Sequence, residues 1–170
     1  MNDDLKAVVY DDTAYQESIR GGSDDIDLSE DRTSLNDRAP VAASHSGGKR
    51  YKTIPRIGKA ALKKCGYECE YGKLKGETHT TFKGTKGHNY LEPHHLIPMK
   101  AQVDFPGKNL DREENIVGLC PNCHSAIHYG DEATRKAVLK VLYDARIDLL
   151  RKCSHHIDIT FDDLFEKYYK

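Results

Sequence analysis

Two groups of residues in this sequence have the types and spacing of metal ligands, and the first is built on cysteine. Cys120 and Cys123 form a C-x2-C pair, which is the spacing of a zinc knuckle. A tetrahedral zinc needs two more ligands, and Cys69 with His79 complete a Cys3His set, which leaves Cys65 unliganded. A redox dithiol is the competing interpretation, but that motif is typical of a strand–helix unit without histidines nearby. The pattern therefore predicts a structural zinc that compensates for a small core.

The second group consists of histidines. His124 and His128 are four residues apart in a segment with helical character, so their imidazoles share one face and suit a divalent metal. The alternative is a pair of surface histidines on a short helix. It is disfavoured because His124 directly follows Cys123, a predicted zinc ligand on the same rigid element.

A histidine doublet lies upstream of this pair, in the stretch "YLEPHHLIPM". Neighbouring side chains on a strand point to opposite faces, but a strand end flanked by prolines can bend both His94 and His95 toward one substrate. The doublet alone does not indicate chemistry, because His155 and His156 repeat it in "KCSHHIDIT" without cysteine or asparagine companions. Its meaning depends on the residues that surround it.

The elements that must position these residues can be predicted from apolar periodicity and capping signals. Residues 73–89 are rich in Gly, Lys and Thr and indicate a loop or a loose hairpin. The other predicted elements are a short basic helix after Pro55, strands over 90–98 and 115–120, a helix that Gly130 closes, a long amphipathic helix over 131–153 and a last helix capped by Thr160. This order predicts an α+β fold.

Charge divides the chain into unlike parts. Residues 1–48 hold 4 Lys and Arg against 11 Asp and Glu, whereas residues 49–110 hold 13 against 5. The acidic part is also rich in Ser and Gly, which predicts a disordered tail or linker before a domain over 49–170. Docking of a protein partner and mimicry of nucleic-acid charge are further interpretations of this tail. The basic block is what a phosphate backbone requires, although lysines that only keep a small domain soluble are the alternative.

The composition also excludes some classes of protein. No apolar run approaches the length of a membrane span, and the acidic N-terminus does not resemble a signal peptide, which favours the cytoplasm and no membrane partner. In that compartment the five cysteines are expected to be thiolates or metal ligands rather than disulfides.

The motif "PHHLIP", Asn115 in "ENIVGLC" and the pair His124 and His128 resemble the HNH endonucleases, also called ββα-metal or His-Me finger nucleases. The resemblance covers about residues 50–170 and is closest to bacterial restriction-type members in "YECE", "HTTF", "NIVGLCPNCH" and "DITFDDLF". It departs from them in a longer loop before His79 and in Pro93. It implies a small ββα-metal core stabilised by zinc and followed by C-terminal helices.

The resemblance also implies roles for single residues. His94 would be a metal ligand and His95 the general base, with His124 and His128 completing the metal site. Asn115 would fix the loop and the orientation of the base. The catalytic ion would be Mg²⁺, Mn²⁺, Ni²⁺ or Zn²⁺. We expect backbone contacts to DNA from the basic block, through Lys49, Arg50, Lys52, Arg56, Lys59, Lys63 and Lys100.

The function implied is metal-dependent hydrolysis of DNA phosphodiester bonds in restriction or phage defence. The alternative is a zinc-stabilised module that binds nucleic acid without cutting it, or a nuclease subunit that a partner protein recruits. A homodimer is compatible with either. Sequence specificity and the role of residues 1–48 are left open, because nothing in the sequence resembles a module that reads bases.

Overall fold

The computed structural model describes residues 6–45 and 48–170. In chain order its helices and strands are β1 (Val8–Val9), α1 (Asp12–Arg20), α2 (Thr33–Asn36), β2 (Ala42–His45), β3 (Gly48–Thr53), α3 (Pro55–Lys64), α4 (Glu70–Leu74), β4 (Glu92–His95), β5 (Ile116–Leu119), α5 (Pro121–Tyr129), α6 (Glu132–Lys152) and α7 (Phe161–Tyr168). Two 3-10 helices, Met99–Asp104 and Glu113–Asn115, lie between β4 and β5.

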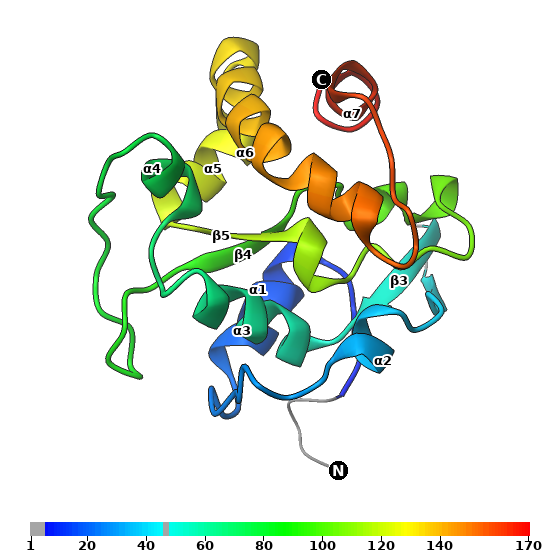
Figure 1. The fold of residues 1–170 in the computed structure, drawn as a ribbon, viewed down its shortest axis with the longest axis horizontal. Helices are drawn as coiled ribbons and strands as arrows, with labels where there is room; N and C mark the ends of the chain where they lie inside the picture. The colour runs from blue at the N-terminus through cyan, green and yellow to red at the C-terminus, as the bar shows by residue number, and fades with distance from the viewer. Residues whose placement is uncertain (1–5, 46–47) are drawn as a thin grey trace.

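The hairpin of β4 and β5 occupies the middle of the molecule, and α5 follows β5 directly, which gives a ββα unit (Figure 1). The strands are antiparallel, with Glu92 opposite Leu119 and His95 opposite Ile116. Helices α1 and α3 lie on one side of the hairpin, and α5 and α6 lie on the other (Figure 1). The predicted α+β class, with a small ββα unit and C-terminal helices, is confirmed.

Two of the predicted helices begin at residues whose side chains cap them. Asp131 accepts a hydrogen bond from the backbone N–H of Thr134 at 2.8 Å and begins α6, and Thr160 accepts from Asp163 N at 3.1 Å and begins α7. Strand β4 is shorter than predicted. Its continuation is interrupted because the Asn115 side chain, rather than a neighbouring strand, binds both backbone polar groups of Ile97.

The N-terminal segment differs from the expected disordered tail wherever the structure describes it. Helix α1 packs on α3, and the side chains of Tyr15, Ile19 and Ile26 are buried. A Cβ atom at Gly58 of α3 would come within 2.5 Å of the Tyr15 hydroxyl, so the glycine makes room for this close approach. Residues 6–45 therefore contribute to the core, while a domain boundary near residue 48 stays a prediction.

Charge complementarity explains why an acidic segment can fold here. Glu30 pairs with Arg56 of α3, Asp11 pairs with Arg50 of β3 at 3.3 Å, and Asp24 lies 3.9 Å from the buried amine of Lys59. The segment thus neutralises part of the basic block that follows it in the sequence. Among the described residues, no helix is long and apolar enough to cross a membrane.

Candidate active site

The four predicted zinc ligands come together at one end of the hairpin. Cys69 is the N-cap residue of α4, Cys120 is the N-cap residue of α5, and Cys123 lies in the first turn of α5. His79 comes from the loop after α4, with Nδ1 3.2 Å from the Cys123 sulfur. One ligand atom from each residue lies within 4.8 Å of all the others, which is compatible with sulfur atoms about 3.8 Å apart around a tetrahedral zinc.

The surroundings of this Cys3His cluster orient its ligands. His79 Nε2 lies 3.0 Å from a Glu77 carboxylate oxygen, so Nδ1 is left to face the sulfurs. A hydrogen bond from Cys123 lowers the pKa of Cys69 to about 4, and the same contact raises the pKa of Cys123. Cysteine binds zinc as a thiolate, so an ion at this cluster would replace the thiol protons. Cys65 stands apart: burial, followed by the charge of Glu70, raises the pKa of its thiol to about 12.

The three predicted ligands of the catalytic ion also converge. His94 is on β4, and His124 and His128 are one turn apart on α5. One nitrogen from each ring lies within 4.8 Å of the others, and the Nε2 atoms of His124 and His128 are 3.0 Å apart. Two imidazole nitrogens on a tetrahedral zinc-like ion are about 3.3 Å apart, so this three-histidine cluster has the spacing of a metal site.

Hydrogen bonds leave the inward nitrogens of this cluster available. Glu92 accepts from His124 Nδ1 at 2.6 Å, which directs the other ring nitrogen at His128. Tyr169 donates its hydroxyl proton to the Leu96 carbonyl at 2.8 Å and lies 2.9 Å from His94 Nε2, so it accepts there and leaves His94 Nδ1 as the free lone pair. Burial, and then the neighbouring imidazoles, hold the pKa of His94 well below its usual range, so the ring is neutral as a ligand must be.

His95 does not point into the three-histidine cluster. Its Nε2 lies 2.8 Å from a carboxylate oxygen of Asp111, and both side chains are buried. Burial alone would raise the pKa of Asp111, but hydrogen bonds from His95 and the Ile54 backbone N–H, with the charge of Arg38, lower it below its usual value. An ionised Asp111 keeps the proton on Nε2, so Nδ1 is the nitrogen that can accept one.

Asn115 holds the loop between the two strands rather than facing either cluster. Its side chain accepts from Ile97 N and donates to the carbonyls of Ile97 and Leu110, each at 2.9 Å. These contacts are compatible with the loop-fixing role that the resemblance implies, and that role stays a prediction. The bond from Leu96 N to the Asn115 carbonyl at 2.8 Å continues the ladder just beyond His95.

The N-terminal segment covers one side of this region. The ring of His95 lies 5.0 Å from that of Tyr15 and 5.5 Å from that of Tyr10, and only 1% of His95 is exposed. Its Nδ1 is buried without a hydrogen-bond partner among the described residues. Asp12, at the start of α1, brings a carboxylate oxygen to 3.8 Å from His124 Nε2.

The predicted DNA-contacting residues fall into two kinds. Lys49 and Lys100 are exposed. Lys59 is buried and donates to the carbonyls of Gly21 and Ser23 at 2.6 and 3.0 Å, so it does not face solvent where a phosphate could bind. Lys63 binds the Ile26 carbonyl. The acidic segment therefore occupies part of the surface that we expected to contact DNA.

Four residues that shape the site were missed by the sequence analysis: Glu92, Asp111, Tyr169 and Glu77. Glu92 could have been found, because it lies two positions before His94 on a strand and therefore on the same face. Tyr169 and Asp111 have no local signal, because both reach the histidines through the fold rather than through a fixed spacing in the sequence.

Comparison with known proteins agrees with this geometry. Residues 65–130 match the model of the HNH endonuclease family, and this part of the chain is an HNH endonuclease domain. A stretch of 66 residues is 39% identical to the type IV methyl-directed restriction enzyme EcoKMcrA of Escherichia coli K12, covering 39% of this chain and 21% of that enzyme. The chain thus spans about a fifth of the length of the curated relative it matches.

A solved structure, that of the type IV phosphorothioation-dependent restriction endonuclease ScoMcrA, is also similar to this chain. The sequence identity is 26% and the TM-score is 0.44, and the match covers 59% of this chain and 18% of that protein.

Proposed function

We propose that this chain is a metal-dependent DNA endonuclease of the restriction type, acting inside the cell. The observation that carries the proposal is the convergence of His94, His124 and His128 on the ββα unit, with His95 held by Asp111 beside it. The similarity to EcoKMcrA supports a role in restriction, which we extend to this chain as a proposal.

The two clusters fit two different ions. Three sulfurs and one imidazole form a closed ligand set, which is the chemistry of a structural zinc. Three imidazoles suit Zn²⁺ or Ni²⁺ better than Mg²⁺, which prefers oxygen ligands. The Asp12 carboxylate, 3.8 Å from His124 Nε2, lies beside this set of three nitrogens. When bound, a divalent ion at the three histidines would stabilise charge on the scissile phosphate and on the leaving oxygen.

The protein's own residues supply the remaining chemistry. When the segment that carries Tyr10 and Tyr15 moves aside, His95 takes a proton from the attacking water through Nδ1. Asp111 keeps Nε2 protonated and stabilises the imidazolium that forms. Asn115 holds the loop that carries Asp111, so the base keeps its orientation. Glu92 and Tyr169 fix two of the three imidazoles that would hold the ion.

A plasmid-nicking assay tests the proposal. Purified protein, loaded with zinc, should nick supercoiled plasmid when Ni²⁺, Mn²⁺, Mg²⁺ or additional Zn²⁺ is supplied, with methylated and unmethylated plasmid compared. His95→Ala should lower the rate by about 10²- to 10⁴-fold while the zinc content and fold are retained. A His95→Ala protein that cuts at the wild-type rate would remove His95 from the mechanism.

A second function, binding of nucleic acid without cleavage, is favoured by one observation. His95 is 1% exposed beneath Tyr10 and Tyr15, so a water cannot reach it unless that segment moves. In that case the protein would bind DNA and show no nicking with any of these ions. A partner protein or a second copy of the chain could then supply target recognition or cleavage, and size measurements with and without DNA would reveal the pairing.

A further inference from the structure

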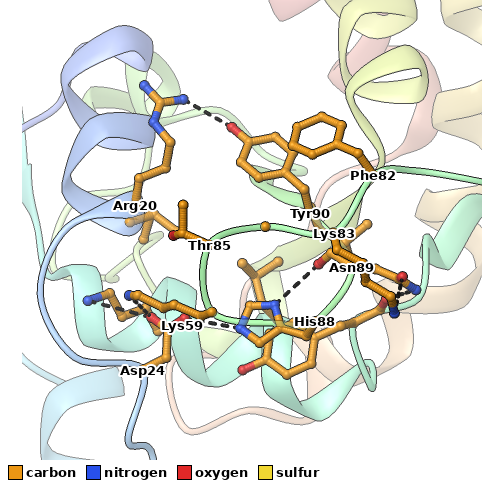
Figure 2. Close-up of a pocket in the computed structure, with 15 residues that line it drawn as sticks. Arg20, Asp24, Lys59, Phe82, Lys83, Thr85, His88, Asn89 and Tyr90 are labelled. Atoms are coloured by element: carbon orange, nitrogen blue, oxygen red, sulfur yellow. Dashed lines mark hydrogen bonds and ion pairs between the residues drawn. The ribbon is translucent and has the colours of Figure 1, made fainter.

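A cavity of about 450 Å³ lies outside the two metal-ligand clusters. It is enclosed by the C-terminal end of α1, the turn that follows it, α3 and the loop over residues 82–91 (Figure 2). A volume of this order is typical of sites that bind small organic groups. Its lining includes the apolar residues Ile19, Leu62 and Leu91.

Flat rings line the cavity in two stacked pairs. Tyr67 and His88 stack with ring centroids 3.6 Å apart and planes 7° from parallel. Phe82 and Tyr90 stack at 4.7 Å and 15°, and Figure 2 shows them side by side at the cavity wall. Phe82 is 61% exposed, so packing in the core does not explain why an aromatic residue stands at this position. Exposed aromatic faces beside an apolar cavity are what a nucleobase stacks on.

The charge of the lining is suited to a nucleotide. It includes four Lys or Arg side chains against a single Asp. The carboxylate of Asp24 already contacts Lys86 at 2.7 Å and His88 at 3.1 Å. Arg20, Lys83 and Lys86 are exposed around the cavity, where they would attract the phosphates that flank a bound base.

The cavity is also connected to the three-histidine cluster. Arg20 donates to the Tyr90 hydroxyl at 3.0 Å, and that hydroxyl donates to Glu92 at 3.1 Å. The other carboxylate oxygen of Glu92 accepts from His124 at 2.6 Å. A wall residue of the cavity and a predicted metal ligand are therefore bound to the same carboxylate.

We propose that this cavity holds one unstacked base of the DNA strand whose phosphate lies at the three-histidine cluster. The proposal rests on the proposed function for the identity of the ligand. The aromatic pair Phe82 and Tyr90 supplies the stacking face, and the surrounding cations hold the neighbouring phosphates. Because stacking is available to every base, the cavity selects for an unpaired base rather than for a sequence.

The test measures binding to a short single strand of deoxyadenylate and to an abasic strand of the same length. No divalent ion is added beyond the structural zinc, so that binding is measured without cleavage. Two variants are compared with the wild type: Phe82→Ala removes a stacking ring, and Thr85→Phe places a larger side chain at a position that lines the cavity (Figure 2). Leu149→Ala, another exposed apolar residue, is the matched control because it lies on α6 away from the cavity.

The wild type and Leu149→Ala should bind deoxyadenylate about tenfold or more tightly than either cavity variant. All four proteins should bind the abasic strand within about twofold of one another, because it has no base to stack. Equal losses for Phe82→Ala on both strands, or unchanged binding by Thr85→Phe, would overturn the proposal and leave the cavity to a small apolar molecule or a partner side chain.

Plasmid nicking by the same preparations separates this proposal from the proposed function. If the wild type never nicks plasmid but the strand comparison behaves as expected, the cavity binds a base and the endonuclease assignment fails. If the wild type nicks and the strand comparison shows no dependence on the base, the endonuclease assignment stands and the cavity proposal fails. Circular dichroism and zinc content establish that the variants are folded.

Discussion

The two clusters of metal-binding residues lie on the same ββα unit but differ in their exposure and in the number of their ligands. The Cys3His cluster has four candidate ligands, with its three cysteines at most 4% exposed. The three-histidine cluster has three, and His128 is exposed. Four protein ligands fill the coordination sphere of a tetrahedral zinc. Three protein ligands leave at least one coordination position open for water or a phosphate oxygen.

The second difference is in what surrounds the ligands. The Cys3His cluster ties the loop over residues 75–91, through His79, to α4 and the start of α5. The three-histidine cluster sits on β4 and α5, which the hairpin and the core already hold. We therefore expect damage at the first cluster to affect the fold, and damage at the second to affect chemistry.

The largest expected effect is the loss of the fold when the Cys3His cluster is broken. Cys123→Ser removes a thiolate, and structural zinc sites contribute on the order of 10 kcal/mol in small zinc-binding peptides. Zinc content should fall to near zero, and cooperative thermal unfolding should be lost. The matched control is Cys65→Ser, because Cys65 is a half-buried cysteine outside the cluster. If both variants unfold like the wild type, the cluster has no structural role.

The corresponding change at the three-histidine cluster should leave the fold intact. His128→Ala removes one of three ligands, and loss of the ion's charge stabilisation costs several kcal/mol, or roughly a thousandfold in nicking rate. One equivalent of zinc and the unfolding temperature should be retained. Tyr129→Ala, at the next position of α5 and 86% exposed, should nick at the wild-type rate. Unfolding of His128→Ala with zinc loss would show that the two clusters are not separate in function.

The next largest effect is expected at Asp111, whose carboxylate orients the proposed base His95. Asp111→Asn keeps the shape but lets either nitrogen of His95 carry the proton, so nicking at pH 7 should fall about a hundredfold. The pKa of Asp111 is lowered in the fold, so its ionic contacts stabilise the protein above about pH 4 and are lost as the pH falls through the lowered value. The difference in the free energy of unfolding between the wild type and Asp111→Asn should therefore be smaller at pH 3 than at pH 7. A wild-type nicking rate in Asp111→Asn would contradict this role.

The next prediction compares two glutamates, each bonded to a histidine of one cluster. Glu92→Gln should weaken divalent-ion binding at the three-histidine cluster by about 10- to 100-fold, because the glutamate orients His124 and favours its ligand form. Glu77→Gln changes the same contact at His79, but three cysteines remain to hold the zinc. Metal titrations followed by calorimetry should show the loss only for Glu92→Gln. Equal losses of affinity would mean that the Cys3His cluster depends on its glutamate as strongly as the three-histidine cluster does.

The sequence predicted which residues gather in the two clusters, and two pairs among them follow from local structure. A C-x2-C pair at a helix start and two histidines one turn apart are fixed by helix geometry, whatever the rest of the chain does. The pairing of Asp111 with His95 and of Tyr169 with His94 could not be predicted in the same way. These contacts depend on how a loop and the C-terminal end of the chain pack against β4.

The N-terminal segment shows a different limit. Its acidic, Ser- and Gly-rich composition is that of a disordered chain when it is considered alone. Composition cannot reveal that α3 and β3 carry basic side chains that pair with it, or that Gly58 leaves room for Tyr15. Removal of residues 1–48 would therefore expose core residues, and substitutions such as Tyr10→Ala are the better way to uncover His95.

The smallest expected effect concerns one lysine beside each cluster. Lys100 is exposed, and its charge contributes to the lowered pKa of His128, after burial and the charge of His124. Lys73 lies beside Cys69 and pairs with Glu68 at 3.5 Å. If DNA passes over the three-histidine cluster only, Lys100→Ala should lower the salt dependence of DNA binding by about one phosphate contact, and Lys73→Ala should leave it unchanged. The measurement is the slope of log affinity against log salt concentration for each variant. Equal slopes for the two variants would mean that DNA does not pass preferentially over the three-histidine cluster.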